Sequence, residues 1–338
     1  MKFWKTILAL LLAVSLTACA QSPKTPDTPE DSTLQETPVE NPEGEPAGEP
    51  VTVRIGALKG PTAMGMADLA GKDGYELTLA GSADELTPAL AKGELDVACV
   101  PANLASVLYN QTEGGLLCLA VNTLGVLYIV ENGDTIHSMA DLAGKTIVAA
   151  GKGSTPEFGL RYLLQENGLD PDGDVAIDWK SEHAECVAAL AAGTASAALL
   201  PQPFVTVAQT KQEGLRTALD LTEEWEKLDN GSAMITGVAV IRREFAGAHP
   251  EAVETLLEDY KASVDWVNGS TADAAAKIGE LGIIEAPVAE KALPYCNIVC
   301  ISGPEMEAKL SGYLQVLYDA LPQSVGGALP GHDFYFGA

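Results

Sequence analysis

The chain has 338 residues, with 20 Lys and Arg against 47 Asp and Glu, which gives a formal net charge of −27 at pH 7. Nucleic acid is excluded as a partner, because binding a phosphate backbone requires a basic surface. Six cysteines spread thinly over this length form no disulfide framework. The length is sufficient for an N-terminal extension followed by two medium-sized lobes or one large domain.

Residues 1–18 have the pattern of an export signal. Lys2 and Lys5 precede an apolar run over residues 7–13, which is too short to span a bilayer. The run ends in the sequence Leu-Thr-Ala-Cys, which resembles the lipobox of bacterial lipoproteins. This resemblance implies cleavage before Cys19 and lipidation of its sulfur. We therefore expect an extracytoplasmic protein that is anchored to the bacterial cell membrane through lipid on Cys19.

Residues 19–50 are predicted to be a disordered tether. Seven Pro and eight acidic residues occur between residues 21 and 50 against one Lys, and large apolar side chains are almost absent. At polyproline pitch, such a tether reaches up to about 90 Å from the membrane.

From residue 51 onward, apolar strand patterns alternate with amphipathic helix patterns, which favours an α/β fold. Residues 122–125 break this pattern, and around residues 232–241 the chain becomes apolar and extended again. A mostly helical carboxyl third follows, beginning with a helix that starts at Pro250. The strands are expected at residues 51–58, 75–80, 96–100, 116–121, 126–130, 146–150, 175–179 and 197–200, and the helices at 62–69, 82–92, 102–109, 156–167, 182–192 and 250–267.

The alternating region repeats itself one hundred residues apart. Ala89–Pro101 aligns without a gap on Ala189–Pro201, and both copies have the pattern of a helix end, a Gly stop, a short strand and a Pro-started loop. Upstream, the strand-like residues 55–58 and 147–150 both lead into a Lys-Gly loop. Two similar βα lobes follow from these matches. Because ligands gather at the carboxyl ends of such strands, facing lobes would form a binding cleft.

Several segments resemble the periplasmic-binding-protein type II fold, and within it the group of sulfonate- and thiamine-precursor-binding proteins. The resemblance covers about residues 51–338. It is carried by residues 141–148, 153–155, 160–164, 240–245, 249–251, 297–299 and 302–303, and by the final Gly326-Gly327 to Tyr335. Many relatives carry Glu-Pro where this chain has Gln202-Pro203. This difference puts a carboxylate-dependent ligand contact at residue 202 in doubt.

The resemblance implies an α/β protein of two similar lobes, each a mostly parallel sheet flanked by helices, joined by a two-strand hinge. Lobe I would comprise residues 51–121 plus 237–338, and lobe II residues 124–235. The crossovers would fall near residues 122–124 and 234–237. Such lobes close on a small molecule in the manner of a hinge.

The candidate ligand-binding residues follow from the strand ends and from the hinge. Helix N-termini leave backbone N–H groups unpaired, so the loops before Thr62 and Thr155 suit a polar or anionic group, although their hydroxyls could equally cap the helices. Lys59 and Lys152 stand at corresponding strand ends and could clamp a negative group, although most loop lysines are simply solvated. The full set is Lys59, Gly60, Pro61, Thr62, Met64, Ser82, Pro101, Asn103, Asn122, Thr123, Lys152, Gly153, Ser154, Thr155, Ser181, Gln202, Phe204 and Thr236.

Catalytic patterns are absent from the sequence. The segment from Gly151 to Thr155 lacks the order of a phosphate-binding loop, and no Gly-x-Ser-x-Gly motif occurs. The four His residues show no metal spacing. His183 lies between two glutamates and is expected to face solvent. We therefore expect no enzymatic activity, no metal and no cofactor.

These observations predict a monomeric solute-binding protein of an ATP-driven importer, which captures a small polar or anionic organic solute. Its partners would be this solute, the membrane, and an ABC permease with its ATPase. A cell-surface sensor that uses the same clamp is the alternative, and an enzyme of pyrimidine synthesis is the weakest hypothesis. The solute itself cannot be predicted, because specificity rests on a few side chains whose geometry the sequence does not give.

Overall fold

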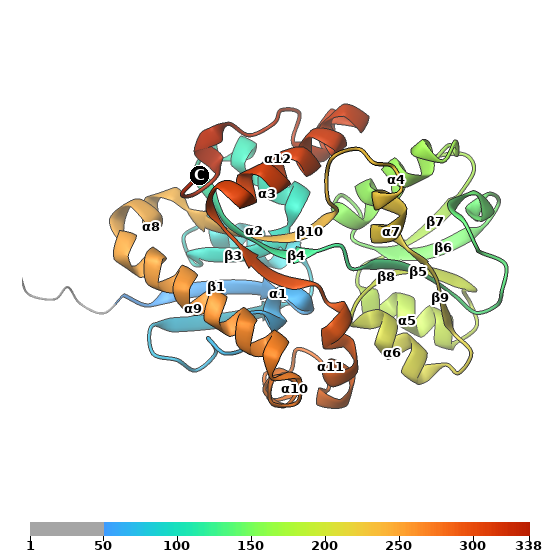
Figure 1. Ribbon diagram of the computed structural model, residues 1–338, viewed down its shortest axis with the longest axis horizontal. Helices are drawn as coiled ribbons and strands as arrows, with labels where there is room; N and C mark the ends of the chain where they lie inside the picture. The colour runs from blue at the N-terminus through green and yellow to red at the C-terminus, as the bar shows by residue number, and fades with distance from the viewer. Residues whose placement is uncertain (1–50) are drawn as a thin grey trace, which may run out of the picture. The chain divides into compact units, whose positions relative to one another are not determined.

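A computed structural model describes residues 51–338, which form two α/β lobes (Figure 1). The predicted signal, the tether and Cys19 lie outside the described residues. Within 51–338, no helix has the length and apolar character that a membrane span requires. The prediction of a two-lobed α/β fold is confirmed.

The larger lobe is built on a six-stranded sheet with the order β11-β4-β10-β3-β1-β2. Its strands are β1 (Val53–Leu58), β2 (Tyr75–Ala80), β3 (Val97–Pro101), β4 (Leu116–Leu124), β10 (Ile235–Arg242) and β11 (Ile298–Ile301). Its helices are α1 (Pro61–Met64), α2 (Ala83–Ala91), α3 (Ala102–Gln111), α8 (Arg243–Ala248), α9 (Pro250–Gly269), α10 (Thr271–Glu280), α11 (Ala286–Ala292) and α12 (Gly303–Ala320), with short 3-10 turns at Leu293–Tyr295, Pro322–Val325 and His332–Phe334.

The smaller lobe is built on a five-stranded sheet with the order β7-β6-β8-β5-β9. Its strands are β5 (Leu127–Glu131), β6 (Thr146–Ala150), β7 (Ala176–Lys180), β8 (Ala197–Pro201) and β9 (Arg216–Asp220). Its helices are α4 (Thr155–Glu166), α5 (His183–Ala191), α6 (Phe204–Lys211) and α7 (Leu221–Glu226), with a 3-10 turn at Met139–Leu142.

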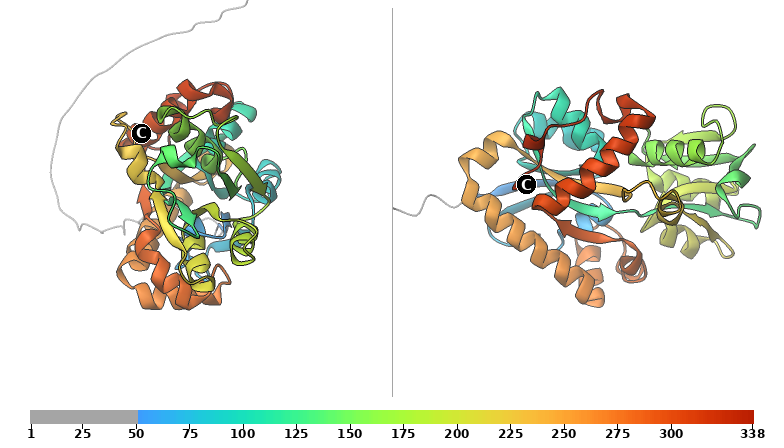
Figure 2. Two further views of the ribbon diagram at one scale, coloured as in Figure 1. Left: turned by 90° about the vertical axis from the view of Figure 1, so that its right-hand side faces the viewer. Right: turned by 45° about the horizontal axis from the view of Figure 1, so that its top comes forward.

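Both sheets are mixed, whereas mostly parallel sheets were expected. In the larger sheet β1 pairs in parallel with β2 and β3, but β10 runs antiparallel to β3 and β4. In the smaller sheet β5 runs antiparallel to both β8 and β9. The reason is the connection between the lobes: β4 leads out of the larger lobe and β10 returns beside it, so the two neighbours run in opposite directions (Figure 2).

The internal repeat predicted from the sequence is confirmed as two corresponding helix-to-strand units. Helix α2 and strand β3 end at Ala91 and Pro101, and helix α5 and strand β8 end one hundred residues later at Ala191 and Pro201. Both helices are followed by a glycine in the left-handed conformation, with φ of 73° at Gly93 and 68° at Gly193. Glycine is favoured there because a Cβ disfavours this conformation.

One predicted element differs clearly in length. A helix was expected over residues 62–69, but α1 ends at Met64 and continues as turns. Gly65 itself keeps a helical backbone conformation, with φ of −63° and ψ of −18°. A side chain would not fit there, because a Cβ would lie 2.9 Å from a methyl carbon of Ile298. The chain at this position is packed closely against β11, and glycine also weakens the helix.

One apolar core runs through both lobes on the side of α12. It contains Val100 and Leu314 of the larger lobe together with Ile129 and Leu160 of the smaller lobe. Trp225 of α7 is fully buried at the junction, with its ring centroid 4.8 Å from that of Tyr162 and 5.4 Å from that of Tyr313. The lobes are therefore joined by packed side chains as well as by the chain crossings.

Each lobe also buries one carboxylate beside arginine. In the larger lobe, the Asp96 carboxylate accepts hydrogen bonds from Arg54 at 2.6 and 2.8 Å and from Arg242 at 3.2 Å. In the smaller lobe, the Glu131 carboxylate accepts from Arg216 at 2.8 Å and from the backbone of Thr135 and Ile136.

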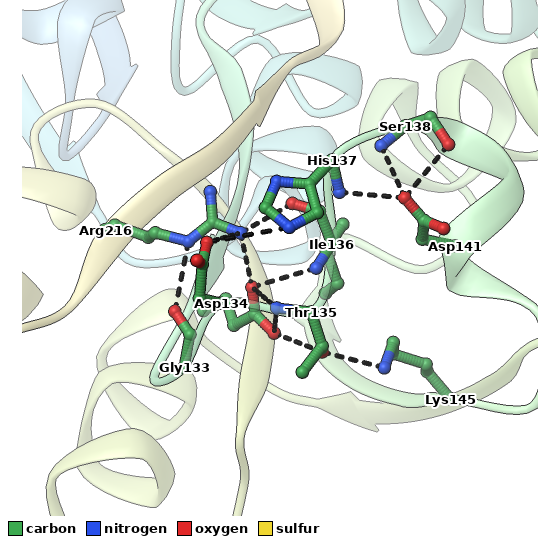
Figure 3. A network of polar contacts seen from close by, with 10 residues as sticks. Gly133, Asp134, Thr135, Ile136, His137, Ser138, Asp141, Lys145 and Arg216 are labelled. Atoms are coloured by element: carbon green, nitrogen blue, oxygen red, sulfur yellow. Dashed lines mark hydrogen bonds and ion pairs between the residues drawn. The ribbon is translucent and has the colours of Figure 1, made fainter.

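Figure 3 shows the loop around the second carboxylate. Arg216 also donates to the carbonyl oxygens of Gly133 and Ile136, at 3.0 and 2.6 Å, and Lys145 donates to the Thr135 hydroxyl at 2.8 Å. Burial raises the pKa of Glu131 and of Asp96, but hydrogen bonds and the arginine charges outweigh burial, so both pKa values lie below the usual range. These networks fix loops within each lobe.

Candidate ligand-binding cleft

A cavity of about 140 Å³ lies between the two lobes at the ends of the strands. A cavity of roughly 150 Å³ accommodates one benzene molecule, so the space suits a small organic compound. The cavity is lined by Leu58, Lys59, Gly60, Pro61, Thr62, Gly81, Ala83, Pro101, Thr123, Val126, Leu127, Ser154, Pro156, His183, Pro201, Gln202, Phe204 and Thr236.

Many candidates from the sequence meet at this cavity. They come from the loop after β1, the ends of β3 and β4, the start of α4, the loop after β8 and the start of β10. The repeat explains this convergence, because corresponding strand ends of two similar lobes face one another. The candidates in the lining are Lys59, Gly60, Pro61, Thr62, Pro101, Thr123, Ser154, Gln202, Phe204 and Thr236.

Four buried candidates lie outside the lining. Met64 is fully buried in the core of the larger lobe. Asn103 donates from Nδ2 to the carbonyl oxygen of Ser324 at 2.9 Å, and Thr155 donates to Asn103 Oδ1 at 3.3 Å. Asn122 is fully buried and accepts from the Thr123 hydroxyl at 3.1 Å. These side chains support the walls and do not face the cavity.

Four candidates in loops also lie outside the lining: Ser82, Lys152, Gly153 and Ser181. Gly153, whose φ of 77° is left-handed, and Lys152 are exposed. The structure therefore brings only Lys59 of the expected lysine pair to the cavity. The side chain of Lys152 is exposed to solvent, whereas Ser154, two residues later, lines the cavity.

Neither the Thr62 hydroxyl, in α1, nor that of Ser154, the N-cap residue of α4, makes a side-chain capping bond. Thr62 donates to the carbonyl oxygen of Leu58 at 3.0 Å, and Ser154 donates to that of Gly151 at 2.7 Å. Each hydroxyl oxygen retains acceptor capacity, so a ligand could donate a hydrogen bond to it.

The cavity also includes residues that the sequence did not place in a binding site. His183 is half-buried and lines the cavity, contrary to the expectation that it faces solvent. Its ring lies beside Phe204, with 5.3 Å between ring centroids, and its Nδ1 atom has no hydrogen-bond partner among the described residues. Burial lowers the pKa of His183 to about 4, so the imidazole is neutral at pH 7. The sequence placed His183 at the start of a helix, but it did not show which side of that helix the imidazole occupies.

The described residues contain no arrangement that suggests catalysis. Across 51–338, no group of three or more His, Cys, Asp or Glu side chains could hold a metal ion. The cysteines in this range are free thiols, and burial raises the pKa of Cys99 and of Cys186 to about 12. Thiols with such pKa values remain protonated at pH 7 and are poor nucleophiles.

A cavity at the strand ends between two α/β lobes is the kind of place at which such proteins bind small molecules. The family described as "ABC transporter, phosphonate, periplasmic substrate-binding protein" matches residues 66–282, and the chain belongs to this family. Proteins of this family are extracytoplasmic, bind small-molecule solutes for an ABC permease with its ATPase, and are not enzymes. The predictions of a substrate-binding protein of an ABC transporter and of no enzymatic activity are thereby confirmed.

Several solved structures share this fold. An ABC transporter protein from Parabacteroides distasonis is 23% identical, with a TM-score of 0.71 over 84% of this chain and 98% of that one. The periplasmic aliphatic sulphonate binding protein SsuA from Escherichia coli is 19% identical, with a TM-score of 0.65 over 82% and 96%. The alkanesulfonate-binding protein SsuA from Xanthomonas axonopodis pv. citri, bound to MOPS, is 19% identical, with a TM-score of 0.63 over 84% and 96%. Comparison with curated protein sequences found no match.

Proposed function

We propose that this chain is a lipid-anchored, monomeric solute-binding protein, which captures a small polar or anionic organic molecule in the cleft and delivers it to an ABC permease. The observation that carries the proposal is the cavity lined by both lobes, with Thr62 and Pro101 on one side and Ser154 and Phe204 on the other. A ligand that contacts both lobes stabilises the closed arrangement, which is how such proteins signal occupancy to a transporter.

The proposal includes the domain organisation expected from the sequence. Residues 1–18 are the export signal, Cys19 carries the lipid, and residues up to 50 form the tether. Lobe I comprises residues 51–121 and 237–338, and lobe II comprises residues 124–235. The ligand contacts are those candidates that line the cavity, with Lys59 as the one cationic group among the described lining residues.

Native mass spectrometry of the gently purified full chain tests solute binding. We expect a co-purifying small molecule that is released on unfolding. When added back at about one hundred times its dissociation constant, this molecule should stabilise the fold by about 2.7 kcal/mol. A chain that carries no solute, and whose melting temperature no small metabolite raises, would contradict the proposal.

Metabolic labelling with radioactive palmitate tests the anchor. The wild-type chain should take up label and sediment with membranes. The Cys19→Ser variant should lose the label and leave the membrane fraction, since two or more acyl chains are required for stable anchoring. Label that persists in the variant would place the modification elsewhere.

A further inference from the structure

A second cavity lies beside the cleft, and one side chain borders both. The cleft has a volume of about 140 Å³, and the second cavity has a volume of about 270 Å³. Phe204, the first residue of α6, lines both, and no other described residue does so. The ring of Phe204 therefore forms part of the wall between the two spaces.

The two cavities are neighbours along the same two helices. On α5, His183 lines the cleft and the adjacent Ala184 lines the second cavity. On α6, Phe204 lines both, and Val207, three residues later, lines the second cavity only. Because an α-helix rises about 1.5 Å per residue, these positions on α6 differ by only about 4.5 Å along the axis. The second cavity thus begins within one helical turn of the cleft.

The second cavity suits an apolar group. It lies where α6 of the smaller lobe contacts α11 of the larger lobe (Figure 1). Its charged lining residues, Lys211 and Glu285, are exposed to solvent. Its buried and half-buried lining residues are all apolar: Val187, Phe204, Val207, Ile284 and Val288. An aliphatic chain gains free energy on moving from water into such surroundings, in proportion to the apolar area that is buried.

The cleft, in contrast, supplies hydrogen-bonding groups from both lobes. Thr62 of the larger lobe and Ser154 of the smaller lobe both line it, and their hydroxyl oxygens can accept from a solute. A molecule with a polar head and an apolar chain would therefore match the cleft and the second cavity in turn. The ring of Phe204 stands between the two.

We propose that Phe204 sets the length of the solute. Its ring closes the cleft toward the second cavity and limits the wild-type chain to a compact molecule, so the second cavity becomes a subsite for an apolar chain only when the ring is removed. A cavity of roughly 150 Å³ holds one benzene molecule, so the compact solute has about six non-hydrogen atoms. This inference rests on the proposed function, since it specifies the size class of the solute in the same cleft.

Titration calorimetry with two homologous series tests the length limit. The full chain in detergent, freed of co-purifying solute, is titrated with the primary amides from acetamide to octanamide and with the sodium carboxylates of the same chain lengths. A titration of each probe into detergent alone is subtracted. Two series are used because the inference concerns the length of the solute and not the charge of its head group.

The wild-type chain and Phe204→Ala should respond differently to chain length. In the wild type, the affinity should rise up to about six non-hydrogen atoms and then stop rising or fall. Phe204→Ala should bind the shortest probes more weakly, because a wall of the cleft is lost. Its affinity should continue to rise by about fourfold for each added methylene group, as burial in the second cavity predicts.

Two further variants separate the partition from general loosening. Phe204→Leu keeps a smaller apolar side chain and should give an intermediate length limit. Val207→Ala is the matched control, because it widens the second cavity but leaves the ring of Phe204 in place. It should therefore keep the wild-type limit. Circular dichroism melts establish that all three variants fold.

The same length limit in Phe204→Ala and the wild type would overturn the proposal. An extended limit in Val207→Ala, or a wild-type affinity that rises as far as octanamide or octanoate, would overturn it as well. If the wild type carries a co-purified solute in any of these cases, solute capture stands and only the role of Phe204 is refuted. A chain that binds neither series refutes the role of Phe204, and if it also carries no solute, the proposed function fails with it.

Discussion

Trp225 and Phe204 of the smaller lobe both lie toward the larger lobe, and their surroundings differ sharply. Trp225 is fully buried between Tyr162 and Tyr313, and its Nε1 donates to Ser232 at 3.1 Å. Phe204 is half-buried and lies between two hollows, the cleft and a second cavity of about 270 Å³ that it shares with Val288 of α11.

The difference indicates where the lobes can separate. Close packing around Trp225 makes that side costly to open, because moving the packed rings apart would leave voids and forfeit dispersion attraction. The side of Phe204 holds empty space and unpaired polar atoms, so a change of spacing costs less. We therefore expect ligand-linked motion to widen or narrow the side of Phe204 and to pivot near Trp225.

The largest effect is expected from removing the packed aromatic. Trp225→Ala should lower the free energy of unfolding by about 3–5 kcal/mol, as a large aromatic deleted from a core does. Urea denaturation followed by circular dichroism measures this change. Trp266→Ala is a suitable control, because Trp266 is only half-buried on α9 and should cost less. Equal losses in the two variants would contradict the idea that Trp225 joins the lobes.

Acid should weaken the interior of each lobe through its buried carboxylate. The pKa values of Asp96 and Glu131 are lowered in the folded state, so their contribution is complete above the ordinary carboxyl pKa of about 4 and is lost as pH falls below it. Asp96→Asn should cost about 2–3 kcal/mol at pH 7, since charge-assisted bonds to Arg54 and Arg242 are weakened. The same variant should show a flatter decline between about pH 5 and pH 2 in unfolding measurements. If the free energy of unfolding of the variant fell with pH as steeply as that of the wild type, the acid sensitivity would have to come from other groups.

An added methyl group at Gly125, where the chain crosses from β4 into the smaller lobe, should destabilise the fold. A Cβ on Gly125 would overlap the hydroxyl of Thr222, so Gly125→Ala should destabilise the fold by about 1–3 kcal/mol. Adding Thr222→Ala removes the overlapping atom and should restore part of that loss. Thermal denaturation of the single and double variants measures both effects. No recovery in the double variant would show that the cost has another origin.

The smallest effect on stability is expected at the cleft. Phe204→Ala should change the free energy of unfolding by about 1 kcal/mol or less, because its side chain already borders two cavities. Loss of the co-purifying solute in native mass spectra should nevertheless be clear. A large loss of stability without loss of solute would reverse the roles that we assign to Phe204 and Trp225.

Much of the architecture could be predicted from local pattern. The match of Ala89–Pro101 to Ala189–Pro201 located two helix-to-strand units whose ends the structure reproduces. Helical and extended periodicity depend on neighbouring residues, so a linear sequence records them. Strand direction was harder to predict: β10 pairs antiparallel with β3, which is more than one hundred residues away, and no local signal sets that direction.

In the cleft too, some residues could be predicted from local sequence and others could not. Strand ends and glycine loops in the sequence predicted Thr62, Ser154 and Phe204, because ligand sites form where such ends meet. His183 was visible only as a residue among glutamates, and its burial beside Phe204 depends on the packing of α5 against α6. Lys152 resembled Lys59 in the sequence, yet its loop turns to solvent.

The sequence by itself determined the two repeated lobes and the helix starts at the cleft, because these follow from periodicity, glycine and helix-capping patterns within short segments. The tertiary structure alone decided which side chains share the cavity and that Trp225 is buried at one side of the junction. Such features depend on distances between residues that are remote in the chain, and these distances are set only when both lobes pack together.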